Sequence, residues 1–254
     1  MRAALERFST YSWLDEVDLV EVVDVVDHGD VTDPDGPGGR GRVAEAIRGV
    51  DLACELLIVL GGDNSATAAA LSALAGDELD TWGLITLDAH LDLRDGRSNG
   101  SPVRELLASG LDGAYVVQIG IADFANSAAY AQDAARAGIT VIPRCSLRER
   151  PMGDAVTEAL AVAGHGGRRI YVDVDLDVVD RAAVPGCPAA APGGLTPDEL
   201  RCAVRLLAAA RQVRAIDVTE VDVERDADDE RTVRLAALVV LEALAGLARR
   251  RPCP

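Results

Sequence analysis

The sequence predicts a single α/β domain in which a mainly parallel sheet carries helices on both faces. Short apolar segments alternate with longer segments of helical periodicity along the 254-residue chain, which is the pattern of repeated strand–helix–strand units. The apolar segments are rich in valine, isoleucine and leucine, as expected of parallel strands that are buried on both sides. With 49% hydrophobic residues, the chain can fill one large core. We find no linker long enough to divide residues 1–254 into separate domains.

The strands are predicted from short apolar runs at residues 56–61, 84–87, 115–121, 139–142, 170–176 and 213–221. Helical patterns fill the intervals, at residues 65–75, 102–109, 126–137, 154–163, 197–210 and 231–249. The helix at residues 197–210 has the clearest start, because Thr196 can cap it and Pro197 suits its first position. The segment at residues 30–42 (DVTDPDGPGGRGR) is rich in glycine and proline and predicts a loop.

The chain is strongly acidic, with 42 Asp and Glu residues against 25 Lys and Arg and a formal net charge of −17. This balance argues against nucleic acid and anionic membranes as partners, because both would repel the protein. The apolar run at residues 235–247 is too short and too closely flanked by arginine to span a bilayer. The N-terminus lacks the apolar core of a signal peptide, and the five cysteines contain no CxxC pair. These features predict a reduced, cytoplasmic protein.

Acidic side chains gather where two of the predicted strands end. Asp88, His90 and Asp92 follow the second strand and alternate, so their side chains point the same way in an extended chain. The segment IYVDVDLD holds a second alternating set: Asp173, Asp175 and Asp177. Several carboxylates on one face of a buried strand repel each other and are costly to desolvate, and a divalent cation removes that cost. Carboxylates with one histidine suit Mn²⁺ better than they suit a thiolate-preferring metal. One Asp-x-Asp pattern is weak evidence, but two groups at strand ends predict a metal site.

Two further polar segments follow predicted strands. GGDNS, at residues 61–65, lies between the first strand and the first helix, where a tight turn with an Asn or Ser cap is the ordinary interpretation. TEVD, at residues 219–222, ends the last strand. Glu220 in this segment could pair with a cationic group of a substrate, and a surface salt bridge is the alternative.

Taken in order, these segments resemble the ureohydrolase superfamily of arginases, agmatinases, guanidino-acid hydrolases and formimidoylglutamases. The family pattern has a GGDHS-like turn, DAHxD, a short segment containing Gly-(Thr/Gln)-Pro, SxDxDxxDP with a downstream PGGL, and an EVNP-like end. The corresponding segments here are GGDNS, DAHLD, NGSP, DVDLDVVDR with PGGL, and TEVD. The resemblance extends over residues 8–249 and implies an arginase-like, three-layer α/β/α domain.

The resemblance also implies two Mn²⁺ ions and a bridging hydroxide that attacks the carbon of a linear amidine. When Asp180 is matched to the last Asp of the family segment, Asp175 and Asp177 fall on ligand positions. Asp173 then falls on the neighbouring serine position, behind the ligands. The remaining implied ligands are Asp88, His90, Asp92 and, at the family's histidine position, Asn64. Asp92 is also the implied general base that passes a proton to the leaving amine.

Substrate contacts are expected from the loop after the second strand and from the end of the last strand. Arg94, in DAHLDLR, could bind a substrate carboxylate as a bidentate fork, and a surface arginine is the alternative. The other candidates are Asn99, Ser101 and Glu220, of which Asn99 and Glu220 are also placed among the catalytic residues.

Two positions and the N-terminus depart from the family. Asn64 replaces a metal-binding histidine with a weaker, neutral donor, so one or two Mn²⁺ ions are expected. Asn99 stands where arginases have a histidine that helps to protonate the leaving group, and an amide cannot transfer a proton. The chain also starts inside what looks like the first helix, so either the family's first strand is missing or the true start lies upstream.

Three functions remain open on this evidence. Formimidoylglutamate hydrolysis to glutamate and formamide is favoured by DAHLDLR, by NGSP and by the absence of histidine at position 99. Hydrolysis of another guanidino compound, of the agmatine, guanidino-acid or arginine type, would be favoured by a Glu220 that lines the pocket. A degenerate relative that binds a ligand without turnover is the third alternative. Relatives are commonly trimers or hexamers, so a homo-oligomer that acts on a small molecule is expected.

Overall fold

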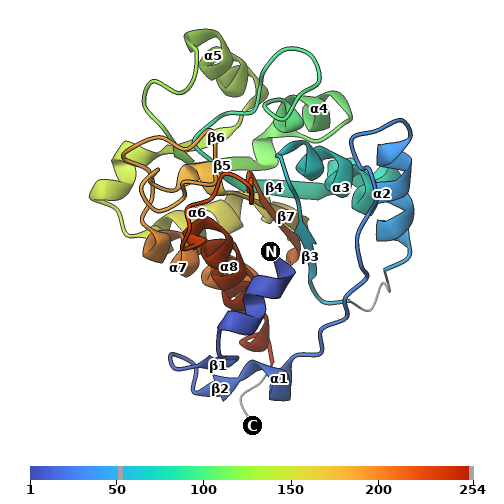
Figure 1. Cartoon of the computed structure of the whole chain (residues 1–254). Coiled ribbons are helices and arrows are strands. Elements are labelled where there is room, and N and C mark those ends of the chain that lie inside the picture. The colour runs from blue at the N-terminus through green and yellow to red at the C-terminus, as the bar shows by residue number, and fades with distance from the viewer. Residues whose placement is uncertain (51–53, 252–254) are drawn as a thin grey trace.

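The computed structural model describes residues 1–50 and 54–251. Six strands form a parallel sheet in the order β3-β8-β7-β4-β5-β6 (Figure 1). Their bounds are β3 (Leu57–Leu60), β4 (Trp82–Leu87), β5 (Val116–Ile121), β6 (Thr140–Pro143), β7 (Arg169–Asp175) and β8 (Val213–Thr219). Every residue of β4 and β5 is buried, which explains their mainly apolar sequences, in which Thr86 and Gln118 are the polar exceptions. The predicted parallel sheet is confirmed.

Helices connect the strands as the sequence periodicity predicts. They are α3 (Ser65–Ala75), α4 (Pro102–Ala108), α5 (Ala128–Ala137), α6 (Met152–Ala163), α7 (Pro197–Ala209) and α8 (Arg231–Ala248). The expected cap of α7 forms a complete capping box, in which the Thr196 side chain accepts from the Glu199 amide and the Glu199 side chain accepts from the Thr196 amide. Short 3₁₀ turns punctuate the connections: η2 (Gly76–Thr81), η3 (Gly113–Tyr115), η4 (Arg144–Arg148), η5 (His165–Gly167) and η6 (Leu176–Val178).

The N-terminal region differs from the sequence-based expectation. The first segment is a 3₁₀ turn, η1 (Arg2–Arg7), and two short strands, β1 (Tyr11–Ser12) and β2 (Val17–Asp18), follow it before α1 (Leu19–Val22). The segment predicted as a loop at residues 30–42 already contains the start of α2 (Gly39–Arg48). Glycines at its start hide this helix in the sequence, and its Ile47 side chain packs into the core beside α3.

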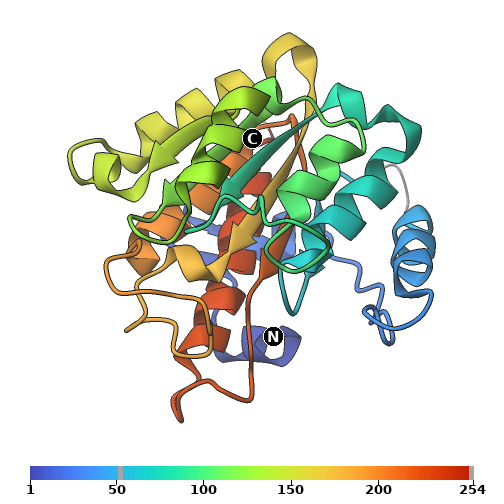
Figure 2. The same ribbon diagram turned by 90° about the horizontal axis from the view of Figure 1, so that it is seen from above.

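Helices cover both faces of the sheet. Buried side chains of α6, α7 and α8 form one core with the strands, and side chains of α2, α3, α4 and α5 form a second core on the opposite face. Figure 2 shows the sheet between these helices. The arrangement is the expected three-layer α/β/α architecture. Within the described part of the chain, no helix is both long and apolar enough to cross a membrane.

Candidate metal centre

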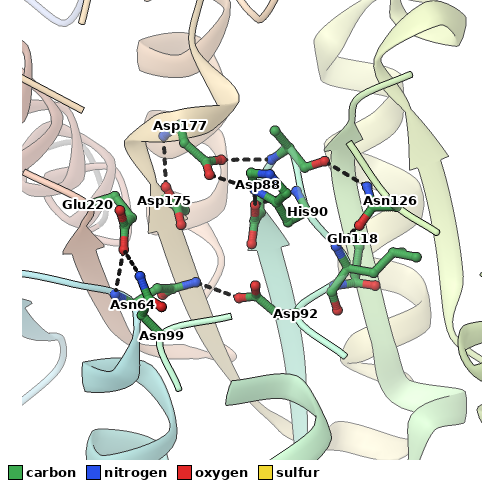
Figure 3. A network of polar contacts seen from close by, with 12 residues as sticks. Asn64, Asp88, His90, Asp92, Asn99, Gln118, Asn126, Asp175, Asp177 and Glu220 are labelled. Carbon is green, nitrogen blue, oxygen red and sulfur yellow. Dashed lines mark hydrogen bonds and ion pairs between the residues drawn. The ribbon is translucent and has the colours of Figure 1, made fainter. Parts of the chain in front are cut away.

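The four strands β3, β8, β7 and β4 are neighbours, and each ends beside the same polar cluster (Figure 3). Asn64 follows β3, Asp88 follows β4, Asp175 ends β7 and Glu220 follows β8. Because all four strands run in the same direction, their carboxyl ends meet at one edge of the sheet. Residues that are far apart in the sequence are thereby brought together at one edge of the sheet.

One group that could hold a metal consists of Asp88, His90 and Asp177, whose potential ligand atoms lie within 4.8 Å of one another. The Nδ1 atom of His90 is 2.7 Å from Asp177 Oδ2 and 3.5 Å from Asp88 Oδ1. The Asp177 carboxylate also accepts the backbone N–H of Ala89 at 3.0 Å, and Asp175 accepts the backbone N–H of Asp177 at 2.7 Å. Through its contacts with Ala89 and His90, Asp177 therefore joins the turn after β7 to the loop after β4.

A second group consists of Asp88, Asp92 and Asp173, again with one oxygen of each within 4.8 Å of the others. Asp88 and Asp173 are fully buried, and one oxygen of each, Oδ2, has no hydrogen-bond partner among the described residues. Asp92 Oδ2 accepts from Asn64 Nδ2 at 2.6 Å. A buried carboxylate oxygen without a donor is unfavourable, so the unpartnered oxygens beside Asp92 fit a bound cation.

The electrostatics of the cluster reflect a shortage of positive charge. Burial, and then the neighbouring carboxylates, raise the pKa of Asp88, Asp92, Asp173 and Asp175 well above their ordinary value. Hydrogen bonds to Asp177 and Asp88 raise the pKa of His90 to about 11. Burial and mutual repulsion therefore disfavour the charged forms of these carboxylates, and a divalent cation would offset that cost.

Behind the cluster lies a second buried polar layer. Asp217 of β8 accepts from Thr67 Oγ1 and from the Tyr171 hydroxyl, each at 2.8 Å, and burial raises its pKa to about 6. Asp217 is paired in register with Asp173, which is paired in turn with Thr86 of β4. The alternation of each strand places these side chains on the face covered by α3.

A cavity of about 240 Å³ opens beside the cluster. His90, Asp92, Asp175, Asp177 and Glu220 line it together with further side chains from the surrounding loops: Arg94, Asn99, Asn126, Ser127 and Tyr130. Glu220 Oε1 accepts the backbone N–H of Asn64 at 3.1 Å and Asn99 Nδ2 at 3.3 Å. The predicted substrate residues Arg94, Asn99 and Glu220 therefore share one cavity.

Ser101 lies elsewhere. It is fully buried, and its hydroxyl accepts the backbone N–H of Ser98 at 2.6 Å and donates to the Ser98 carbonyl at 2.9 Å. These bonds shape the turn that carries Asn99, and Ser101 is not among the residues that line the cavity. Its direct contact with a substrate stays a prediction.

The sequence interpretation missed the loop after β5. Asn126 accepts the backbone N–H of Leu91 at 2.8 Å and donates to the Ala89 carbonyl at 3.1 Å, which fixes the segment that carries His90 (Figure 3). The sequence predicts Asn126 as the first residue of a helix, five residues after a predicted strand, so only the short loop after that strand pointed to it. Asp217 was missed for a different reason, because a single Asp inside an apolar strand does not reveal its neighbours.

Comparison with known proteins follows from this geometry. The family model described as "Arginase family" matches residues 1–246. The chain belongs to the arginase family. Its six-stranded parallel sheet and its polar strand ends agree with that membership.

Two relatives in this family are formimidoylglutamases. That of Bacillus subtilis (strain 168) is 38% identical over 195 residues, which cover 75% of this chain and 60% of the relative. That of Halalkalibacterium halodurans is 41% identical over 194 residues, which cover 74% of this chain and 60% of the relative. The chain thus spans about 60% of the length of these curated relatives.

The crystal structure of the formimidoylglutamase from Bacillus subtilis superposes with a TM-score of 0.87 at 33% identity, covering 97% of this chain and 79% of that chain. Proclavaminate amidinohydrolase from Streptomyces clavuligerus superposes with a TM-score of 0.84 at 26% identity, covering 98% of this chain and 85% of that chain. Both superpositions extend over nearly the whole of this arginase-family chain.

Proposed function

We propose that this arginase-family chain hydrolyses the C–N bond of a linear amidine, with formimidoylglutamate, which yields glutamate and formamide, as the best candidate substrate. The observation that carries the proposal is the buried carboxylate–histidine cluster that forms one wall of the cavity. The relatives named formimidoylglutamase, at 38% and 41% identity, favour this substrate over other amidines.

We propose that the cluster binds Mn²⁺ through Asp88, His90, Asp92, Asp175 and Asp177, with Asn64 beside the second position. The donor set supports this metal, because carboxylates and one imidazole are the ligands that Mn²⁺ prefers. The unpartnered oxygens of Asp88 and Asp173 support it as well. Mn²⁺, when bound, supplies a nucleophile at neutral pH and polarises the amidine.

The protein's own side chains then position the substrate and move protons. Asp92 is buried beside the cavity and can accept a proton from the attacking water and return it to the leaving amine. Glu220 can hold the cationic amidinium, because burial leaves it few other partners. Asn99 can orient the leaving group by hydrogen bonding, although its amide transfers no proton.

Arg94 is the proposed determinant of substrate class. It is exposed at the rim of the cavity, and its side-chain carbons lie against Gly100, where an added Cβ would approach Arg94 Cδ to 2.7 Å. Arg94 and Glu220 line the same cavity. An amidine with a distant carboxylate would place one charged end at each of these two residues.

A second candidate is hydrolysis of another amidino or guanidino compound. The proclavaminate amidinohydrolase of Streptomyces clavuligerus is 36% identical over 174 residues, which cover 65% of this chain and 53% of that protein. Glu220 at the cavity wall suits a guanidinium as well as a formimidoyl group.

The test is an assay of the purified protein loaded with Mn²⁺ against formimidoylglutamate, arginine, agmatine and guanidinobutyrate, with formamide, urea and ammonia measured separately. Turnover of formimidoylglutamate with release of formamide supports the first proposal, and urea from a guanidino compound supports the second. Metal binding without any turnover would contradict both and favour a non-catalytic binding protein.

We also propose that the protein acts in a reducing, cytoplasmic compartment and as a homo-oligomer, trimeric or hexameric. Four cysteines of the described residues are free, which supports the first point. Trp13 and Leu14, exposed at 85% and 72% between β1 and β2, support the second, because apolar side chains of this size gather at subunit contacts.

A further inference from the structure

Asp173 is a fully buried carboxylate in β7, at the position where the resemblance places serine. We propose that Asp173 adds a charged oxygen ligand to the second cation position, which it forms with Asp88, Asp92 and the carbonyl oxygen of Asn64, and that this all-oxygen donor set selects a hard divalent cation such as Mn²⁺ or Mg²⁺. The inference rests on the proposed metal-dependent function and concerns this position alone. The resemblance implies that Asp173 lies behind the metal ligands. The inference assigns Asp173 as a ligand itself.

The position of Asp173 provides the first argument. One of its oxygens lies within 4.8 Å of potential ligand oxygens of both Asp88 and Asp92. Asp173 and Asp88 are both fully buried, and their Oδ2 atoms have no hydrogen-bond partner in the described part of the chain. Two buried, unpartnered oxygens beside a third carboxylate therefore share a space that suits a cation.

The backbone prevents Asp173 from leaving this space. It lies within β7 in register between Thr86 of β4 and Asp217 of β8, in the middle of the sheet. Because the side chain cannot reach solvent from a central strand, its charge must be compensated in place.

The hydrogen-bond pattern around Asn64 provides an independent argument. Asn64 Oδ1 lies 2.8 Å from Thr67 Oγ1 and 3.1 Å from Thr219 Oγ1, and its Nδ2 faces Asp92. Each hydroxyl has a single proton, yet Thr67 Oγ1 also lies 2.8 Å from Asp217 Oδ2, and Thr219 Oγ1 lies 3.4 Å from Asp173 Oδ1.

If the two threonines donate to these two carboxylates, their oxygens must accept protons from Asn64. The amide then turns its NH₂ group towards Thr67 and Thr219 and its carbonyl oxygen towards Asp92. An amide oxygen facing the Asp92 carboxylate oxygen is favourable when a cation binds both oxygens or when the carboxyl group keeps its proton, so in this orientation the pair suits a cation. Asp173 thus contributes in two ways, as a ligand and as the acceptor that helps to set the orientation of Asn64.

The two cation positions consequently differ in chemistry. The position at Asp88, His90 and Asp177 includes an imidazole nitrogen and accepts borderline metals. The position at Asp88, Asp92 and Asp173 offers oxygen only, and such a donor set prefers Mg²⁺ or Mn²⁺ to Zn²⁺.

The test is metal titration of the whole purified protein after chelation, followed by calorimetry and elemental analysis, with Mn²⁺ and Zn²⁺ as probes and no substrate. The wild type should bind two Mn²⁺ per chain. Asp173→Ser, which restores the family residue, and Asp173→Asn should bind one tightly and the second at least about tenfold more weakly. The matched control Asp198→Asn, an equal charge change on the exposed start of α7, should behave as the wild type.

Thermal unfolding with and without Mn²⁺ distinguishes the loss of a metal ligand from a simple folding defect. Asp173→Asn removes repulsion from the metal-free cluster, so its melting temperature without metal should equal or exceed that of the wild type, while the increase upon addition of Mn²⁺ should be smaller. A lower melting temperature without metal, together with an unchanged increase, would mean that Asp173 only supports the strand and would overturn the inference.

The outcomes separate this inference from the proposed function. If the wild type binds two Mn²⁺ and Asp173→Ser binds them equally well, the inference is wrong and the metal-dependent function stands. If the wild type binds no Mn²⁺, the proposed function fails together with the inference.

Discussion

His90 shows how one side chain at the cluster depends on its surroundings. It is held between Asp88 and Asp177, and these hydrogen bonds raise its pKa to about 11. A cation can bind the imidazole only after the ring has lost this proton, so metal binding must release protons. The carboxylates that hold the proton in the metal-free protein are the same groups that would hold the metal.

Arg94→Ala tests substrate recognition at the residue scale. Loss of the guanidinium should raise KM for formimidoylglutamate and guanidinobutyrate by about 10- to 100-fold, because a charged hydrogen bond to the substrate carboxylate is removed. Agmatine has no carboxylate, so any activity on it should be unaffected. The measurement is steady-state kinetics on both types of substrate.

Arg97→Ala is the matched control, since Arg97 belongs to the same loop and pairs with Glu105 at 3.2 Å. Equal losses in the two variants, or a loss that includes agmatine, would contradict the assignment of Arg94 to the carboxylate.

At the scale of elements, the loop between β4 and α4 supplies most of the site and depends on contacts from outside. The backbone N–H of Arg104 donates to the Asp92 carbonyl at 3.1 Å, and its Nε donates to the Leu93 carbonyl at 2.8 Å. The Arg104 guanidinium also pairs with Asp133 of α5 at 2.9 Å. Asp92 adopts a positive φ of 52°, an uncommon conformation for a residue with a side chain, and these contacts hold it there.

The C-terminal end of α8 depends on a single buried arginine. The Arg250 guanidinium donates to the carbonyls of Ala208, Val213 and Glu55 at 2.7, 2.8 and 3.1 Å, which joins α8 to the end of α7 and to the strands β3 and β8. Arg250→Ala leaves these carbonyls without a donor and should lower the free energy of unfolding by about 3 kcal/mol.

Urea unfolding of the metal-free protein checks this value. Arg234→Ala, on the exposed side of the same helix, should change the free energy of unfolding by less than about 0.5 kcal/mol. Similar losses from both substitutions would contradict the assignment of the effect to the three carbonyl contacts, because alanine is the better helix former and helix propensity alone predicts no loss.

At the scale of the whole molecule, the titratable groups of the cluster make the free energy of unfolding depend on pH. We expect bound metal to reverse the direction of this dependence. The pKa values of Asp88, Asp92, Asp173 and Asp175 are raised by burial from 3.8, and that of Asp217 is raised to about 6. The folded state therefore binds more protons than the unfolded state above about pH 4. His90 acts in the same direction, since its contribution is complete below its ordinary pKa of 6.5 and is lost as the pH rises towards about 11.

The metal-free protein should thus be more stable at about pH 5 than at about pH 8. With Mn²⁺ present, the order should reverse, because the metal requires deprotonated ligands. Thermal unfolding with a chelator and with Mn²⁺ at both pH values provides the measurement. Greater stability of the chelated protein at the higher pH would show that the cluster does not retain its protons.

Most helices and strands of this molecule could be predicted from the sequence pattern of each segment alone. The six sheet strands and the helices from α3 to α8 have strong periodic patterns, and the structure confirms each of them within a few residues. Helix α2 was missed because its glycines resemble a loop and only its burial against α3 stabilises it. The gathering of Asp88, His90 and Asp177 could be anticipated, since the carboxyl ends of parallel strands share one edge.

The sequence by itself determined the element order, the parallel sheet and the presence of carboxylates at strand ends, because these depend on periodicity and composition. Only the tertiary structure decided which groups meet across strands. Register places Asp173 beside Asp217 and close to Asp88 and Asp92. The turn at Ser98 holds the Ser101 hydroxyl by hydrogen bonds, and Ser101 is not among the residues that line the cavity. The physical reason is that side-chain contacts between strands depend on sheet order and register, and neither is encoded in the residues of any one segment.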